Sequence, residues 1–132
     1  MNKKETLAKF LEVEVDDIEE STYDENTLCL GDDDYLVLTD EEADERAKEQ
    51  IIESIWAFNS WFIVDHTPEG IESDVVEIMQ EKCEGSNEAF KRMIVDLDAF
   101  VDDAICADGR GHFISSYDGK ENEEGDYFIY RQ

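Results

Sequence analysis

The sequence predicts an α+β fold, in which a small antiparallel sheet made of two hairpins is covered by three to four amphipathic helices. Two regions with short runs of β-branched and aromatic residues, 27–38 and 112–130, predict the hairpins. The segments between them carry apolar residues at helical spacing. Because 41% of the 132 residues are hydrophobic and 11% are aromatic, we expect one folded domain over residues 1–132 and not a disordered acidic tail.

The chain opens with a short amphipathic segment. Leu7, Phe10 and Leu11 fall on one face of a helix, which predicts a helix in the first eleven residues. Acidic residues then alternate with apolar ones over 12–20. This pattern fits either a second helical turn or a strand, and it favours the turn.

A hairpin and a long helix follow. Residues 27–30 and 35–38 are β-rich runs separated by Gly31 and three aspartates, which predicts a hairpin. Thr39 and Glu42 have the spacing of a capping box, so a helix is expected to begin at about residue 40. Apolar residues spaced four apart predict that it continues to about Asn59 with one buried stripe: Ala43, Ala47, Ile51 and Ile55.

The central region predicts a further helix after a break. Residues 61–64 fit either a kinked continuation of the preceding helix or a short buried segment. Thr67 suits an N-cap and Pro68 the first helical position, so a helix is expected to start there. Its predicted core stripe consists of Ile71, Val75, Ile78 and Met79.

The last third predicts a helix and a second hairpin. Apolar spacing over residues 90–105 predicts a helix broken near Asp98, a residue suited to an N-cap, and Gly109 is expected to end it. Residues 108–111 are expected to form a loop. Residues 112–117 and 127–130 then predict two strands around the acidic loop 118–126.

The charge of the chain restricts its partners. There are 37 Asp and Glu against 11 Lys and Arg, which gives a formal charge of −26 at pH 7. Such a chain is repelled by nucleic-acid phosphates and by anionic membranes, so a basic protein is the expected partner. Solubility alone needs a net charge of only about 2–8 in a small domain, and the excess therefore calls for another role.

Imitation of a polyanion is the role that uses this excess. Proteins that bind duplex DNA line a groove with Lys and Arg, and a rigid surface of carboxylates is able to occupy such a groove. The residues predicted to bind the partner form four acidic groups: Glu12, Glu14, Asp16, Asp17, Glu19 and Glu20; Asp32, Asp33 and Asp34; Asp74, Glu77, Glu81 and Glu84; and Glu121, Glu123 and Glu124.

No pattern of catalytic residues is visible. His66 and His112 are the only histidines, and no serine or cysteine lies in a nucleophile motif. Close carboxylate pairs arise by chance among 37 acidic residues, so they do not indicate acid–base catalysis. We therefore expect a protein that is not an enzyme and that binds no cofactor.

The sequence also indicates a compartment. Cys29, Cys83 and Cys106 form no Cys-x-x-Cys pair, which is typical of free thiols in a reducing cytoplasm. The longest apolar run, Trp61–Val64, is far shorter than the ~20 residues that span a bilayer, and the first 20 residues contain no apolar signal-peptide segment. A soluble cytoplasmic protein is expected.

Two other functions remain open at this stage. The chain fits an acidic interaction module that binds a protein through an apolar patch, with its charge serving solubility. It also fits a divalent-metal-binding protein, because clustered carboxylates suit a hard cation such as Ca²⁺. The loops that start at Asp65 and Asp118 come nearest to a calcium-binding pattern, but the first has Val76 in place of its final glutamate and the second has Glu123 in place of glycine.

Three stretches carry a resemblance to a known group of proteins. Residues 35–44 (YLVLTDEEAD), 54–59 (SIWAFN) and 107–119 (ADGRGHFISSYDG) resemble small acidic proteins encoded by bacteriophages and prophages. The resemblance implies a context and assigns no residue a role. Small acidic phage proteins include inhibitors of restriction enzymes and of CRISPR effectors, which often act by DNA mimicry.

Overall fold

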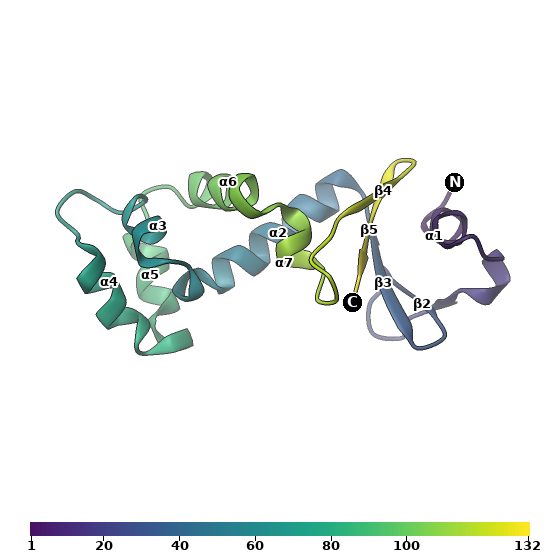
Figure 1. Ribbon diagram of the computed structural model, residues 1–132, viewed down its shortest axis with the longest axis horizontal. Helices are drawn as coiled ribbons and strands as arrows, with labels where there is room; N and C mark the ends of the chain where they lie inside the picture. The colour runs from purple at the N-terminus through teal and green to yellow at the C-terminus, as the bar shows by residue number, and fades with distance from the viewer. The chain divides into compact units, whose positions relative to one another are not determined.

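The computed structural model describes residues 1–132 and contains seven α-helices and one five-stranded sheet (Figure 1). All strand pairs are antiparallel, so the predicted α+β class is confirmed. The chain forms two compact units: unit 1 consists of Met1–Ala47 and Asp108–Gln132, and unit 2 of Lys48–Ala107. The single-domain organisation stays a prediction.

Unit 1 contains the whole sheet, whose strand order is β1-β2-β3-β5-β4. Its strands are β1 (Glu19–Glu20), β2 (Thr27–Leu30), β3 (Asp33–Leu38), β4 (Asn122–Glu124) and β5 (Tyr127–Arg131). Its helical segments are α1 (Lys3–Leu11), the 3-10 helix η1 (Val15–Asp17), the first part of α2 (Asp40–Glu53) and α7 (Arg110–Ile114). The helix at the N-terminus and the hairpin over 27–38 are thus confirmed. The helical turn favoured within residues 12–20 is present at Val15–Asp17, but a short strand, Glu19–Glu20, follows it.

The two faces of the sheet are buried in different ways. Successive strand residues point to opposite faces, so one face carries Tyr35 and Val37 and the other carries Leu36 and Leu38. The Tyr35 face packs against α1 in a cluster of buried residues: Leu7, Ala8, Ile18, Leu28, Tyr35, Val37 and Ile129. Leu36, Leu38 and Tyr130 are buried on the opposite face.

The capping box predicted at the start of α2 is present. The backbone N–H of Glu42 donates to Thr39 Oγ1 at 3.2 Å, and the backbone N–H of Thr39 donates to Glu42 Oε1 at 2.9 Å. Lys3 also reaches this carboxylate, with 2.7 Å between Nζ and Oε1. The Lys3 hydrogen bond and the Thr39 backbone bond lower the pKa of Glu42, because both favour its ionised form.

Removal of the cap gives a first prediction. Thr39→Ala leaves the backbone N–H of Glu42 without its side-chain acceptor, and we expect the free energy of unfolding to fall by about 1 kcal/mol. Urea denaturation checks this value, with Thr22→Ala as the control because Thr22 is exposed and lies outside any helix or strand. Equal stability of the two variants would mean that the capping box contributes nothing.

Unit 2 is helical. Its segments are the end of α2, η2 (Ile55–Ala57), α3 (Ser60–Val64), α4 (Ser73–Gln80), η3 (Cys83–Ser86), α5 (Asn87–Met93) and α6 (Leu97–Asp108), whose last residue belongs to unit 1. Its core contains aromatic side chains in edge contact, such as Phe100 against Phe62 with ring centroids 5.2 Å apart. The four residues of the stripe predicted from residue 43 to 55 are all fully buried, three of them on α2 and Ile55 on η2.

The predicted end of α2 near Asn59 is wrong. The helix ends at Glu53, and η2 and the separate short helix α3 follow. Asn87 explains the early end, because its side chain accepts from the Trp56 N–H at 3.2 Å and donates to the Ile52 carbonyl at 2.9 Å. Gln80 donates to the Trp56 carbonyl as well. These side chains satisfy backbone groups that the continued helix would have paired.

The helix predicted from Pro68 begins later and turns a different face inward. α4 starts at Ser73, and the Thr67 hydroxyl donates to the Val64 carbonyl at 2.8 Å instead of capping a helix. Val76 is fully buried, whereas Val75 is 48% and Ile78 65% exposed. The predicted core stripe is therefore wrong at two of its four positions.

The region 87–117 needs three corrections. The predicted break is confirmed, but the backbone N–H of Ala99 is capped by Asp96 Oδ1 at 3.2 Å and not by Asp98. The expected loop at 108–111 and strand at 112–117 are wrong, because α7 occupies Arg110–Ile114. β4, formed by Asn122–Glu124 inside the expected acidic loop, is the hairpin partner of β5.

Candidate acidic interface

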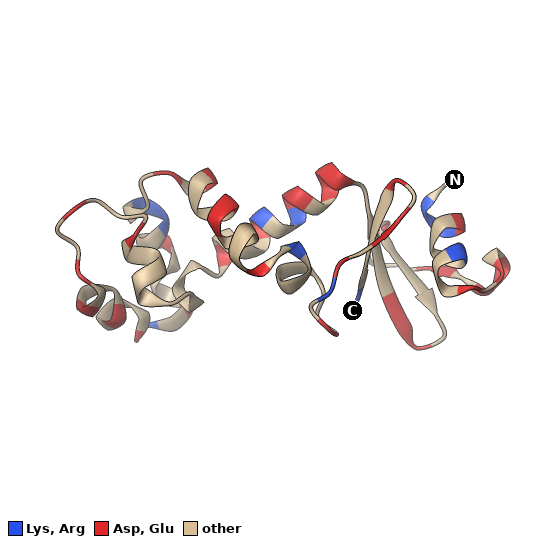
Figure 2. Cartoon of the chain, turned by 45° about the horizontal axis from the view of Figure 1, so that its top comes forward, with Lys and Arg blue, Asp and Glu red and all other residues tan.

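The predicted acidic residues are divided between the two units. Twelve of the sixteen lie in unit 1, and the other four, Asp74, Glu77, Glu81 and Glu84, lie in unit 2. Unit 1 has 23 Asp and Glu against 7 Lys and Arg, a formal charge of −16, and unit 2 has 14 against 4, or −10. Figure 2 shows acidic residues on segments throughout both units. Net charge alone therefore does not identify an interface. The local arrangement of the acidic side chains has to identify it.

The segment Glu12–Glu20 packs on the core of unit 1 through the buried Ile18 and the partly buried Val13. Its six acidic side chains are exposed, whereas Ile18 is only 1% exposed and belongs to the core beneath α1. Glu12 ends α1 in the left-handed conformation with φ of 57°, and η1 and β1 follow. The segment is thus tied to the fold at both ends of its acidic run, and its carboxylates face solvent.

The sheet register brings two of the acidic groups together. Glu19 of β1 lies opposite Cys29 of β2, and Cys29 lies opposite Asp34 of β3. Residues directly opposite each other project from the same face of an antiparallel sheet. Glu19 and Asp34 therefore flank Cys29 on one face, two strand spacings or roughly 10 Å apart.

The end of the hairpin adds to this surface. β2 runs toward the turn at Gly31 and Asp32, and the antiparallel β1 starts at that end, with η1 just before it in the chain. Asp16 and Asp17 therefore lie at the same end of the sheet as Asp32. We use the name acidic edge for the exposed acidic residues around β1 and this turn: Glu12, Glu14, Asp16, Asp17, Glu19, Glu20, Asp32 and Asp34. β1 is an outer strand of the sheet, so the acidic edge is open to a partner.

The thiol of Cys29 lies beside two carboxylates of the acidic edge. A hydrogen bond to Asp34, partial burial, and the charges of Asp34 and Glu19 together raise the pKa of the Cys29 thiol to about 11 from its ordinary value of 9.0. The thiolate would lie beside two carboxylates, and that is why the neutral thiol is favoured. The hydrogen bond to Asp34 and burial contribute most to this shift, and the charges of Asp34 and Glu19 act in the same direction.

This electrostatic effect gives a second prediction. Asp34→Asn removes the largest cause of the shift, so the pKa of Cys29 should fall toward 9.0. Because the thiolate is the reactive form, alkylation of Cys29 by iodoacetamide at pH 8.5 should become at least about tenfold faster. The experiment uses a Cys83→Ser/Cys106→Ser background, since both of these thiols are exposed.

The control for Cys29 is Asp32→Asn. It removes the same charge from the acidic edge, but Asp32 is not among the groups that shift the pKa of Cys29. Its alkylation rate should stay close to that of the background protein. Equal rates for the two variants would show that Asp34 has no special effect on the thiol.

Three of the four other predicted acidic residues of unit 1 form ion pairs within the fold. Asp33 pairs with Arg131 at 2.9 Å, and Glu124 with Lys9 at 3.7 Å. Glu121 accepts from Arg110, whereas Glu123 is exposed on β4 at the sheet's opposite border. The structure therefore does not bring Glu121, Glu123 and Glu124 together with the acidic edge.

The acidic group of unit 2 lies on α4 and η3. Asp74, Glu77 and Glu81 are exposed and lie on or directly after α4, and Glu84 lies on η3.

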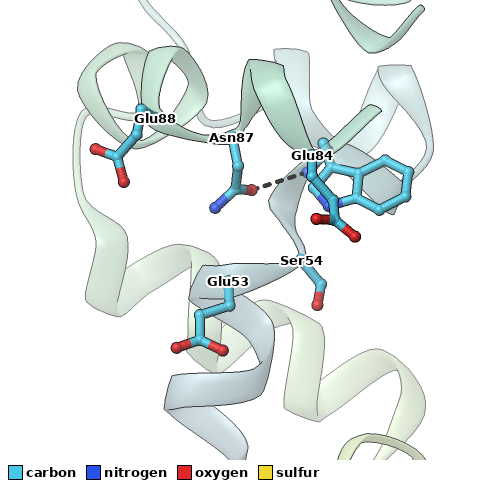
Figure 3. Close-up of a pocket in the computed structure, with 6 residues that line it drawn as sticks. Glu53, Ser54, Glu84, Asn87 and Glu88 are labelled. Atoms are coloured by element: carbon cyan, nitrogen blue, oxygen red, sulfur yellow. Dashed lines mark hydrogen bonds between the residues drawn. The ribbon is translucent and has the colours of Figure 1, made fainter. Parts of the chain in front are cut away.

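Glu84 also lines a pocket of about 470 Å³. Figure 3 shows how the residues of this pocket are arranged: Glu53, Ser54, Trp56, Glu84, Asn87 and Glu88. Three carboxylates beside an indole suit a cationic side chain, and the polar groups of Asn87 are already bound to the α2 end.

Sequence reasoning missed Arg110, which is the best-connected charged residue of unit 1. Its guanidinium contacts Asp40, Asp44 and Glu121 at 2.8, 2.9 and 2.8 Å, and its side chain is only 11% exposed. It also lies 4.7 Å from the centre of the Phe128 ring. The surplus of acidic residues is a sequence signal for such a site, because α2 supplies two carboxylates and the segment before β4 a third, and one cation neutralises them together.

Neither histidine belongs to the predicted acidic groups. His66 pairs with Asp103 at 3.0 Å among the aromatic side chains of unit 2, and His112 is exposed on α7. No three His, Cys, Asp or Glu residues are grouped so that they would hold a metal ion. None of the helices combines the length and the apolar character needed to cross a bilayer.

Comparisons with known proteins identify no relative. No family model matches the chain, and no curated protein or solved structure matches it. The resemblance to small acidic phage proteins therefore stays a prediction.

Proposed function

We propose that this protein is a phage-encoded inhibitor, not an enzyme, that acts in the cytoplasm of a host bacterium. Its acidic edge binds the nucleic-acid channel of a basic host defence protein, either a CRISPR effector or a restriction enzyme, in place of DNA. The observation that carries the proposal is the register that sets Glu19 and Asp34 on one sheet face beside Cys29. The resemblance of the sequence supports the phage context, and the arrangement of Glu19 and Asp34 supports the proposed binding mode.

The rigidity of the acidic edge supports mimicry over simple solubility. A flexible acidic tail loses backbone and side-chain entropy when it is ordered on a partner, whereas carboxylates on a backbone already fixed by a sheet and a buried anchor lose less. Ile18 provides this anchor, and β1–β2 pairing fixes Glu19 and Glu20. Duplex DNA presents one charge per about 1.7 Å of axis, and a preorganised row of charges is what its binding channel recognises.

Capture from a bacterial lysate followed by competition with duplex DNA tests the proposal. The wild-type protein should retain a nucleic-acid-binding protein, and excess duplex DNA should release it. The edge variant carries four substitutions: Asp16→Asn/Asp17→Asn/Glu19→Gln/Asp34→Asn. The amount of partner protein that it retains should fall by at least about tenfold, because charge–charge contacts at the interface are lost.

A matched variant separates arrangement from net charge. Glu45→Gln/Glu49→Gln/Glu69→Gln/Asp102→Asn removes the same four charges from exposed positions outside the acidic edge. This control should retain the partner as the wild type does. The proposal fails if both variants lose the partner equally, or if the captured protein stays bound in excess DNA.

A further inference from the structure

The outer face of α4 combines apolar and acidic side chains without a partner in the chain. Val75 and Ile78 are 48% and 65% exposed, and they lie three residues apart on one side of the helix. The adjacent residue Val76 is fully buried and fixes the helix on its core. α4 therefore buries its centre but leaves its strongest apolar pair in solvent.

Acidic residues border this apolar pair. Asp74, Glu77 and Glu81 are exposed and follow the same helix at spacings of three and four, so they form a row beside Val75 and Ile78. None of the three carboxylates forms an ion pair with a Lys or Arg of the chain. Glu77 has only a hydrogen bond at 3.5 Å from Ser60 Oγ.

We propose that the outer face of α4 binds a basic amphipathic helix of a partner protein. Apolar residues of that helix cover Val75 and Ile78, and its flanking Lys or Arg side chains pair with Asp74, Glu77 and Glu81. This mode of recognition lays one helical face against another and draws its specificity from the charges at the rim. The surface belongs to unit 2 and shares no residue with the acidic edge.

The acidic residues around Val75 and Ile78 determine which kind of partner fits this face. A second copy of the chain would bring two acidic rows together, and unit 2 alone carries 14 acidic against 4 basic residues. An uncharged apolar helix would desolvate the carboxylates without pairing them. A basic amphipathic helix is the occupant that satisfies both parts of this face.

A pair of synthetic peptides tests the proposal. One peptide has leucines at positions i, i+3, i+4 and i+7 of a helix with lysines along both flanks, and the other has the same composition in scrambled order. The full-length protein should bind the ordered peptide at least about tenfold more tightly in a fluorescence-polarisation titration, because only this peptide presents one apolar stripe.

Matched variants place the binding site. Val75→Gln/Ile78→Gln should weaken binding of the ordered peptide by at least about tenfold, whereas Val95→Gln, at a position 74% exposed between α5 and α6, should leave it unchanged. Near-UV circular dichroism confirms that each variant is folded. The edge variant of the preceding subsection should bind this peptide like the wild type, which separates failure of one proposal from failure of the other.

Three outcomes would overturn the proposal. Equal binding of the ordered and scrambled peptides would show that charge alone is recognised. Unchanged binding by Val75→Gln/Ile78→Gln would place the site elsewhere. A wild-type dimer that the same double variant converts to a monomer in sedimentation equilibrium would identify a second copy as the occupant.

Discussion

Replacement of Arg110 by methionine is expected to lower the free energy of unfolding of unit 1 by about 3 kcal/mol. Arg110 is 11% exposed and contacts carboxylates from α2 and from the segment that leads into β4. Burial opposes its charge, but hydrogen bonds from the guanidinium to Glu121, Asp40 and Asp44 outweigh this and raise the pKa of Arg110. Without the guanidinium, three carboxylates are left close together with no cation.

Tyr130 adds to the expected effect. Its hydroxyl donates to Glu121, the same carboxylate that Arg110 holds. Burial and the hydrogen bond to Glu121 raise the pKa of Tyr130, so the phenol remains a donor. Loss of Arg110 frees Glu121 and weakens this buried contact as well.

The chain contains separate optical reporters for the two units. All five tyrosines lie in unit 1, and both tryptophans, Trp56 and Trp61, lie in unit 2. Urea denaturation of Arg110→Met, followed by tyrosine near-UV circular dichroism, therefore measures the unit in which the contacts are lost. Coincidence of the tyrosine and tryptophan transitions in the wild-type protein would support the single-domain prediction.

Two further variants complete the Arg110 experiment. Arg92→Met removes one positive charge from an exposed position of unit 2, so it controls for the change in net charge and should cost less than about 0.5 kcal/mol. Arg110→Lys keeps the charge but lacks the planar fork, and its stability should lie between those of wild type and Arg110→Met. Equal stability of Arg110→Met and Arg92→Met would contradict the structural role of Arg110.

The second large effect is expected for Gly111→Ala. A Cβ at Gly111 would lie 2.6 Å from the carbonyl carbon of Lys120, 2.7 Å from the backbone N of Glu121 and 2.7 Å from the carbonyl O of Gly119. All three are backbone atoms, which do not move aside as a side-chain terminus does. We expect a loss of about 3 kcal/mol, at the upper end of ordinary overpacking.

Gly85→Ala is the matched control for Gly111→Ala. A Cβ at Gly85 would meet only Lys82 Cβ at 3.9 Å, which is an ordinary contact. The substitution should leave stability unchanged or raise it by up to about 1 kcal/mol, because alanine restricts the unfolded chain. Urea denaturation of both variants gives the comparison, and a Gly111→Ala variant as stable as Gly85→Ala would contradict the close backbone approach.

Local signals explain which elements were predictable from the sequence. The capping box at Thr39, the hairpin around Gly31 and the spacing of Ala43, Ala47, Ile51 and Ile55 depend on residues close in sequence. Each of these patterns specifies one structure, and each was confirmed. The acidic edge needed only one long-range fact, the register of β1 with β2 and β3.

Long-range contacts decided the elements that were predicted wrongly. Residues 112–117 are rich in strand formers, which predicted a strand. The structure has a helix instead, and it begins at Arg110, whose partners Asp40 and Asp44 lie 70 and 66 residues away. The tightly packed Gly111 belongs to the same helix. Asn87 ends α2 from a distance of 31 to 35 residues. In α4, Val75 and Val76 offer two apolar stripes of similar quality, and only tertiary packing selects Val76.

Acidic residues are spread over both units, so only their local arrangement supports the proposed function. An excess of charge without arrangement would not favour a DNA mimic over an acidic interaction module, so the proposal depends on the acidic edge and not on the total of −26. Asp33, Glu121 and Glu124 pair with basic residues of the fold, and these three carboxylates serve unit 1 itself.

The association rate of the captured partner, measured as a function of salt, tests the central claim most directly. Stopped-flow mixing of the two purified proteins between 50 and 500 mM NaCl should show a rate that falls by at least about tenfold for the wild type, since the acidic edge steers the encounter. The edge variant should show a much shallower dependence, and the control with four other charges removed should follow the wild type. A wild-type rate that does not change with salt would contradict the claim that this surface takes the place of DNA.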